Sequence, residues 1–108
     1  MLQIEGTITK ILPIKKYETK KGRTFAKCEV WISLSEYDEH TGVTNQRPHA
    51  QSITFEAHNE KAEQITTDYN VGEHVIVKFD VFGQVFAKKN GDESCRNTLV
   101  VRSIWPKD

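Results

Sequence analysis

The chain has 108 residues, a length typical of one domain with a single modest core. Its 15 Lys and Arg residues balance 15 Asp and Glu residues, and this zero net charge excludes nucleic-acid recognition through overall basicity. With 37% apolar residues, and no apolar stretch near the ~20 residues of a membrane helix, we expect one soluble globular domain over residues 1–108.

The first expected strand begins at Leu2. Apolar or small residues alternate with polar ones over residues 2–8, which is the period of a half-buried strand. The apolar phase then shifts to Ile11, and one extra residue near Thr9 and Lys10 would explain the shift as a β-bulge. Pro13 should end the regular pairing, because it has no backbone N–H to donate.

The second strand is expected over residues 24–34. One face is uniformly apolar and should face the core: Ala26, Cys28, Val30, Ile32 and Leu34. The other face mixes aromatic with charged residues, including Trp31, so we expect it to face water or a ligand. Residues 35–50 are polar and contain Gly42 and Pro48, which predicts an extended hairpin tip or a loop.

A third strand over residues 52–58 should bury Phe55, and a short helix should follow it. Asn59 is a favoured N-cap residue, and the helix is expected to stop by Asn70 or Gly72. Its apolar residues recur at helical spacing: Ala62, Ile65 and Tyr69. A fourth strand over residues 74–81, a turn at residues 90–92 and a fifth strand from Leu99 complete the chain.

The predicted order is three strands, a helix and two strands. A flat five-stranded sheet would leave its edges exposed, whereas closure into a barrel removes them. We therefore predict an all-β fold with one short helix, a five-stranded OB-fold barrel whose helix lies between strands three and four. The alternatives are an SH3-like barrel, which usually lacks this helix, and a small open α+β sheet.

Six segments together resemble a known family in their order and spacing: residues 22–26, 35–37, 53–58, 61–63, 71–77 and 98–101. Through them the chain resembles the OB domain of bacterial single-stranded DNA-binding protein (SSB) over residues 2–105. It is also similar to an uncharacterised family of short SSB-like OB domains. It departs from SSB in lacking the Gly/Pro-rich linker and acidic C-terminal tip, and in having Ser52 near the position of a stacking Trp.

Basic residues gather in two expected loops. Five lie between the first two strands, and three between strands four and five: Lys15, Lys16, Lys20, Lys21 and Arg23, then Lys88, Lys89 and Arg96. On an OB barrel both loops border the face of strands two and three, where they can track a phosphate backbone. The alternative is that these lysines only keep a neutral protein soluble.

Aromatic residues supply candidate stacking platforms. Trp31 projects from the outward face of strand two, and the resemblance places Tyr37, His58 and Phe86 at other stacking positions. Each has a simpler interpretation. Trp31 is as readily explained by burial under a second subunit, Tyr37 by packing on the long hairpin, His58 by its place before the helix, and Phe86 by its own loop.

Catalysis finds little support. The histidines and cysteines lack metal-ligand spacing, and no phosphate-binding glycine loop is present, so we expect no enzyme, metal or cofactor. The acidic residues Glu36, Asp38 and Glu39 are best read as a solvated loop tip. Cys28, in a core strand, and Cys95, in a loop, should stay reduced in the cytoplasm, because no signal peptide is recognisable.

The leading hypothesis is sequence-tolerant binding of single-stranded nucleic acid, and the resemblance favours DNA, with a role in replication or repair. The alternative is a protein-interaction or adaptor subunit that binds no nucleic acid. The resemblance also implies a homo-oligomer, a dimer or tetramer. The candidate interface residues are outward-facing apolar ones: Ile76, Phe82 and Ile104.

Overall fold

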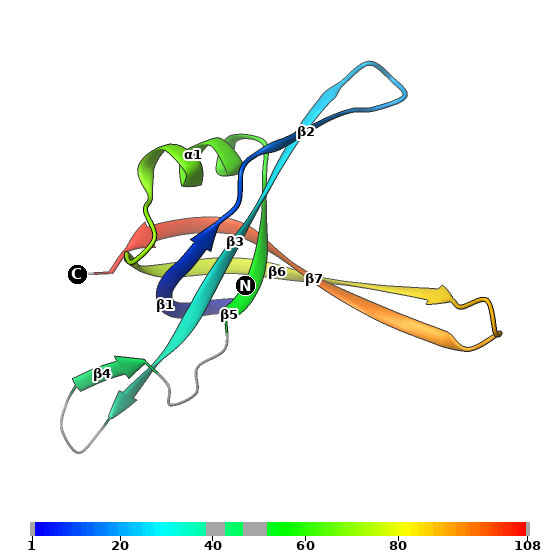
Figure 1. Ribbon diagram of the computed structural model, residues 1–108. Coiled ribbons are helices and arrows are strands. Elements are labelled where there is room, and N and C mark those ends of the chain that lie inside the picture. Colours follow the sequence, from blue (N-terminus) through cyan, green and yellow to red (C-terminus); the bar gives the residue numbers. More distant parts are fainter. Residues whose placement is uncertain (1, 39–42, 47–51, 108) are drawn as a thin grey trace.

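The computed structural model describes residues 2–38, 43–46 and 52–107, and the side chains of residues 2–34 and 52–107. Within these residues, seven strands and one helix follow in the order β1 (Leu2–Ile11), β2 (Lys15–Glu18), β3 (Thr24–Asp38), β4 (Val43–Gln46), β5 (Ser52–His58), α1 (Glu60–Asp68), β6 (His74–Ala87) and β7 (Glu93–Pro106). Figure 1 shows a small barrel from which paired strands extend. Among the described helices, none is long and apolar enough to cross a membrane.

Five strands close the barrel. The ring runs β1–β6–β7–β5–β3 and returns to β1, because β1 pairs with both β6 and β3. The β5–β7 contact is parallel, at Glu56 and Val100, and the other pairings are antiparallel. The helix α1 connects the third and fourth barrel strands, β5 and β6. The predicted OB-fold barrel is thus confirmed over the SH3-like and open-sheet alternatives.

The strand β1 bends to serve both halves of the barrel. Its register against β3 shifts between Ile8 and Lys10, which confirms the predicted bulge. Gly6 lies where β1 passes from one partner to the other, opposite both Leu34 of β3 and Val75 of β6. A Cβ atom at Gly6 would overlap the Ser33 carbonyl oxygen, so only glycine lets the strands approach this closely.

The core lies inside the barrel and under α1. Phe55 and Phe79 meet edge to face, with their ring centres 5.1 Å apart. The three apolar helix residues are buried as predicted: Ala62, Ile65 and Tyr69. The Tyr69 hydroxyl donates to the Ile104 carbonyl oxygen at 3.2 Å, which satisfies the one polar group that this ring brings into the core.

The interpretation of Ile104 as an outward-facing residue is wrong, because its side chain is only 6% exposed. The register between β6 and β7 shifts where Lys78–Phe79 face Ser103 and Val101, so Arg102 is an extra residue in β7. A bulge reverses the alternation of side chains beyond it. Val101 and Ile104 therefore both face inward. Ile76 is half-buried and Phe82 is exposed.

Asn59 occupies the N-cap position, but its side chain makes no capping hydrogen bond to the helix. Its side-chain oxygen instead accepts a hydrogen bond from the Ala26 N–H at 3.0 Å, and its own N–H donates to the Ala26 carbonyl at 2.8 Å. The residue has φ 50°, a conformation that Asn tolerates better than most residues. Asn59 therefore joins the helix start to β3, which corrects its predicted role.

Two hairpins leave the barrel on the same side (Figure 1). We call them the β2–β3 arm, residues 15–27, and the β6–β7 arm, residues 81–99. Both were predicted as loops: Lys15–Glu18 instead forms β2, and Cys95 and Arg96 lie in β7, paired with Val85 and Gln84. Alternation is absent from these segments because an arm that projects into water has no buried face to encode.

The two cysteines lie in contrasting surroundings. Cys28 is 2% exposed in the core, where burial raises the pKa of its thiol, and Cys95 is exposed on the β6–β7 arm. Because the thiolate is the reactive form, we expect one thiol per chain to react with a disulfide reagent such as DTNB in the native protein and two after unfolding. The variant Cys95→Ser should show no fast thiol. Fast reaction of that variant would contradict the burial of Cys28.

Candidate nucleic-acid interface

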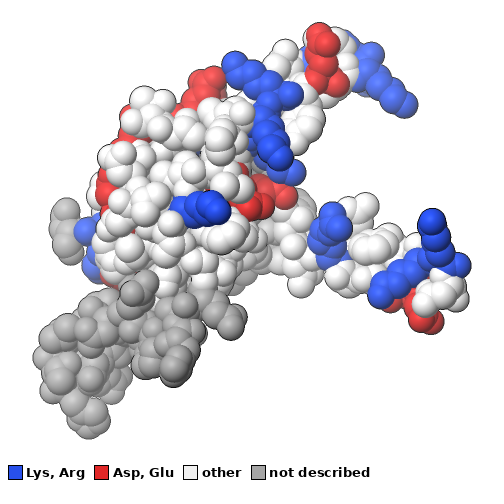
Figure 2. All heavy atoms as spheres, viewed as in Figure 1, with Lys and Arg blue, Asp and Glu red and all other residues white. Residues whose placement is uncertain are grey.

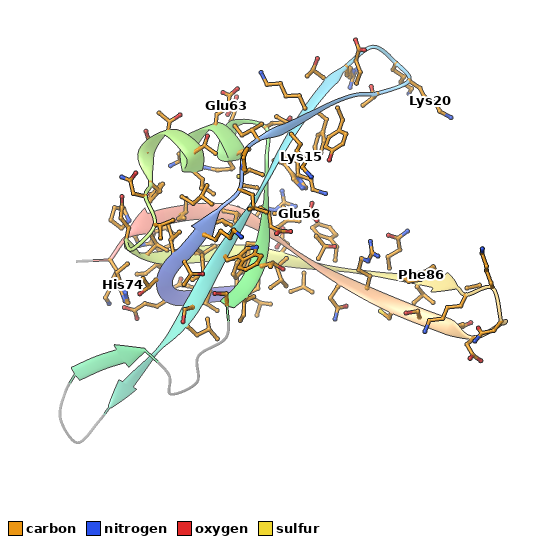
Figure 3. All side chains as sticks on the ribbon, in the orientation of Figure 1. Lys15, Lys20, Glu56, Glu63, His74 and Phe86 are labelled. Carbon is orange, nitrogen blue, oxygen red and sulfur yellow. The ribbon has the colours of Figure 1, made fainter. Side chains whose placement is uncertain are left out.

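The outward face of β3 and β5 lies at the foot of both arms. Three cross-strand pairs place their side chains on this face: Lys27 with His58, Glu29 with Glu56, and Trp31 with Thr54. Figure 3 shows Glu56 between Lys15 on one arm and Phe86 on the other. The face therefore combines aromatic, basic and acidic groups within two adjacent strands.

Trp31 is a half-buried ring held in a defined position. Its Nε1–H donates to Glu29 Oε2 at 2.7 Å, and the Lys10 ammonium lies 4.7 Å from the ring centre in a cation–π contact. The indole is thus fixed by its polar edge and by a cation over one ring face. A stacking platform needs this kind of preorganisation, because a ring that is already ordered loses little entropy when a base packs on it.

His58 belongs to a charge network centred on Glu56. His58 Nε2 lies 3.0 Å and Lys27 Nζ 3.4 Å from the same Glu56 oxygen. Burial acts to raise the pKa of Glu56, but the hydrogen bond from His58 and the positive charge of Lys27 outweigh it, and the pKa is lowered. The Glu56 carboxylate therefore stays ionised in the middle of the face, balanced by two neighbouring groups.

The lowered pKa predicts how stability depends on pH. A group whose pKa is lower in the folded state stabilises the fold above its unfolded pKa, about 4.3 for glutamate, and this contribution disappears as the pH falls through the folded value. We expect the wild type to resist urea better than Glu56→Gln near pH 7, and the two to converge near pH 3. A difference that persists unchanged at low pH would show that the amide disturbs packing rather than charge.

Two clefts lie beside the β6–β7 arm. One, of about 130 Å³, lies between the barrel face and the arm, and its polar lining includes Glu29, Thr54, Glu56, Arg96, Asn97 and Thr98. The other, of about 240 Å³, is lined by Gln84, Phe86 and Arg96. Arg96 lines both clefts, and its guanidinium carbon lies 5.9 Å from the centre of the Phe86 ring. Phe86 is 40% exposed and lies in β6, not in a loop.

The predicted basic residues gather on the two arms. Residues 15–27 hold six basic side chains and one acidic side chain, a net charge of +5, which leaves −5 for the rest of this neutral chain. Figure 2 shows blue groups along both arms and acidic groups between them. Lys88 and Lys89 are exposed at the turn of the β6–β7 arm. The structure thus brings both predicted basic clusters to one side of the barrel.

The backbone of the predicted platform residue Tyr37 pairs with Thr44 in β4, but its side chain lies outside the described part of the structure. Within the described residues, no group of three His, Cys, Asp or Glu side chains could hold a metal ion. Sequence reasoning missed Tyr17, 47% exposed and opposite Phe25, because the four-residue strand β2 is too short to show a period.

Comparisons with known proteins agree with this architecture. The mitochondrial single-stranded DNA-binding protein Rim1 of S. cerevisiae has a similar structure, with a TM-score of 0.57 and 20% identity over 97% of this chain and 91% of its own. The small single-stranded DNA-binding protein of Streptomyces coelicolor is also similar, with a TM-score of 0.56 and 12% identity over 98% and 92% of the two chains. At identities this low, the structural similarity establishes a shared fold alone. No curated protein sequence matches the chain.

The sequence itself matches one family model. That model describes a domain of unknown function, DUF3127, and it covers residues 3–105, which includes the barrel, the helix and both arms. The chain is therefore a member of the DUF3127 family, built on the SSB-like OB fold.

Proposed function

We propose that this protein binds single-stranded DNA on the outward face of β3 and β5, between the two arms, and that it is not an enzyme. The observation that carries the proposal is the convergence of basic side chains from two arms beside one barrel face that presents a fixed indole, Trp31. Basic grooves with aromatic platforms are the common design of OB folds that bind single strands. The two solved structures of similar fold are named as single-stranded DNA-binding proteins, which supports the choice of ligand.

In the proposed mechanism, bases stack on aromatic rings and phosphates contact the arms. The platforms are Trp31, Tyr37, His58 and Phe86, and the phosphate ligands are Lys15, Lys16, Lys20, Lys21, Arg23, Lys88, Lys89 and Arg96. These contacts tolerate any sequence, because every base has a π-face. The ionised Glu56 repels phosphate, so the backbone should run along the arms while the bases point toward the barrel.

A homo-oligomer, a dimer or tetramer, would extend the binding surface beyond one domain and raise affinity through avidity. Phe82 is 50% exposed and remains a candidate interface residue, together with the half-buried Ile76. We place the protein in the cytoplasm, with a role in DNA replication or repair. Sedimentation of the free protein and of its complex with oligo(dT) measures the stoichiometry.

Trp31 gives the direct test of the proposal. In a Trp105→Phe background the remaining tryptophan is Trp31, and oligo(dT) should quench its fluorescence as a base stacks on the ring. Trp31→Ala should weaken binding by ~1–3 kcal/mol, which is the range measured for one stacked base. Thermal unfolding of the variant checks that the domain still folds.

Trp105 supplies the matched control. It pairs with Ile76 near the end of β7 remote from the arm, with Lys78 5.6 Å from its ring centre, so Trp105→Ala should leave affinity for oligo(dT) unchanged. If Trp31→Ala instead changes the sedimentation of the free protein, Trp31 is an interface residue and not a platform. If oligo(dT) produces neither quenching nor binding, an adaptor role replaces the proposed function.

A further inference from the structure

The outward face of β3 does not end at the barrel. Side chains two residues apart in a strand share a face, so Trp31, Glu29, Lys27 and Phe25 form one row that runs from the barrel onto the β2–β3 arm. The strand β2 adds a second row on the same face, because Lys15 is opposite Lys27 and Tyr17 is opposite Phe25. The arm thus continues the surface proposed to bind DNA.

Three aromatic residues follow one another from the barrel face onto this arm: His58, Phe25 and Tyr17. Phe25 meets the His58 ring with centroids 5.0 Å apart and planes inclined by 63°, and Tyr17 lies across the hairpin from Phe25. Tyr17 is 47% exposed, at the outer end of the series. Phe25 is half-buried against the His58 ring, whereas a two-stranded hairpin in water has no core in which to bury Tyr17. The exposed Tyr17 ring is therefore accessible to a ligand.

The charges around these rings indicate the chemical class of ligand that the β2–β3 arm would bind. The arm carries net +5 over residues 15–27, and Lys15 is exposed on the same face as Tyr17. Aromatic rings flanked by ammonium groups suit a ligand with planar bases and regularly spaced negative charges. The surface favours the same DNA strand that the barrel face is proposed to bind.

We propose that the β2–β3 arm is a second segment of the single-strand binding track, in which Tyr17 stacks one base and Lys15 contacts an adjacent phosphate. The strand leaves the barrel face at His58 and follows Phe25 to Tyr17. This inference rests on the proposed function and extends it to two residues of this arm, Tyr17 and Phe25, that were not among the predicted site residues. It implies that long strands reach Tyr17 and that short strands, whose bases occupy the barrel face alone, do not.

The experiment compares oligonucleotide lengths. Oligo(dT) of about 4 and about 16 nucleotides spans the range of site sizes known for single OB folds. Tyr17→Ala should weaken binding of the long strand by roughly 5- to 100-fold, as expected for one lost stacking contact, and change binding of the short strand by less than about twofold. Tyr17→Phe keeps the ring and should bind both lengths like the wild type. The melting temperature of Tyr17→Ala should match the wild type, because the ring lies outside the core.

The outcomes separate this inference from the proposed function. If Tyr17→Ala binds the long strand as well as the wild type does, or loses equal affinity for both lengths, the arm is not a separate segment of the track. If Tyr17→Phe is as weak as Tyr17→Ala, the hydroxyl acts rather than the ring, and stacking is wrong. If the wild type binds neither length, the proposed function itself fails.

Discussion

Raising the salt concentration from about 50 mM to about 200 mM should weaken binding of oligo(dT) by roughly 15- to 130-fold. Each phosphate neutralised on a single strand contributes about −0.7 to the slope of log K against log[salt]. If about three to five of the eight basic residues assigned to phosphates contact the strand at once, the slope is on the order of −2 to −3.5. Because the protein has no net charge, long-range steering is weak and the effect must come from the arms.

The double variant Lys20→Ala, Lys21→Ala tests whether the β2–β3 arm supplies these contacts. Both lysines are exposed at the arm's turn, and their loss should flatten the slope and weaken all sequences about equally, since phosphate contacts carry no sequence information. Lys78→Ala with Lys107→Ala removes the same charge near the end of β6 and β7 remote from the arm, and should leave the slope unchanged. An affinity that stays level with salt would exclude phosphate tracking and favour the adaptor role.

Gly6→Ala should destabilise the domain by ~3 kcal/mol or more, the upper part of the range for overpacking a core. The added Cβ would overlap the Ser33 carbonyl oxygen and lie 2.7 Å from Ile32 Cγ2. Most of the obstruction is backbone, which cannot rotate away. For a domain of this size we expect the melting temperature to fall by on the order of 10–20 °C. Thermal unfolding followed by circular dichroism measures the change.

Gly83→Ala is the matched control for this substitution. Gly83 also lies in a strand, β6, but the nearest atom to an added Cβ is the Asn97 side-chain oxygen at 3.6 Å, an ordinary contact. Replacing this glycine should leave stability unchanged or raise it slightly, because alanine reduces the entropy of the unfolded chain. A similar loss of stability in both variants would mean that the loss at Gly6 does not come from the overlap with Ser33.

The barrel strands were predictable because each carries a local pattern. The alternation of Ala26, Cys28 and Val30 requires only that one face of β3 be buried and the other exposed to water. The phase shift near Thr9 is visible in the sequence and indicates the bulge. The bulge at Arg102 was not recognisable in the sequence, because Val100 and Val101 are consecutive apolar residues whether or not a bulge follows them. Ile104 was therefore assigned to the wrong face.

The arms show the limit of such patterns. A hairpin exposed on both faces has no buried row, so β2 and the outer part of β7 read as polar loops although they are regular strands. Their pairing comes instead from barrel strands β3 and β6, which extend past the core. There β2 remains hydrogen-bonded to β3, and β7 remains hydrogen-bonded to β6. Tyr17 was overlooked for this reason.

The sequence by itself determined the order of the five barrel strands along the chain, the helix position and the presence of two basic clusters, since all three depend on neighbours along the chain. Only the tertiary structure decided which of these groups meet. The closeness of His58 and Lys27 to one Glu56 oxygen, and of Arg96 to both clefts, comes from strand registers that pair residues distant in the sequence, such as Lys27 with His58. Local periodicity records which face a side chain occupies, but it contains no information on the partner across the sheet.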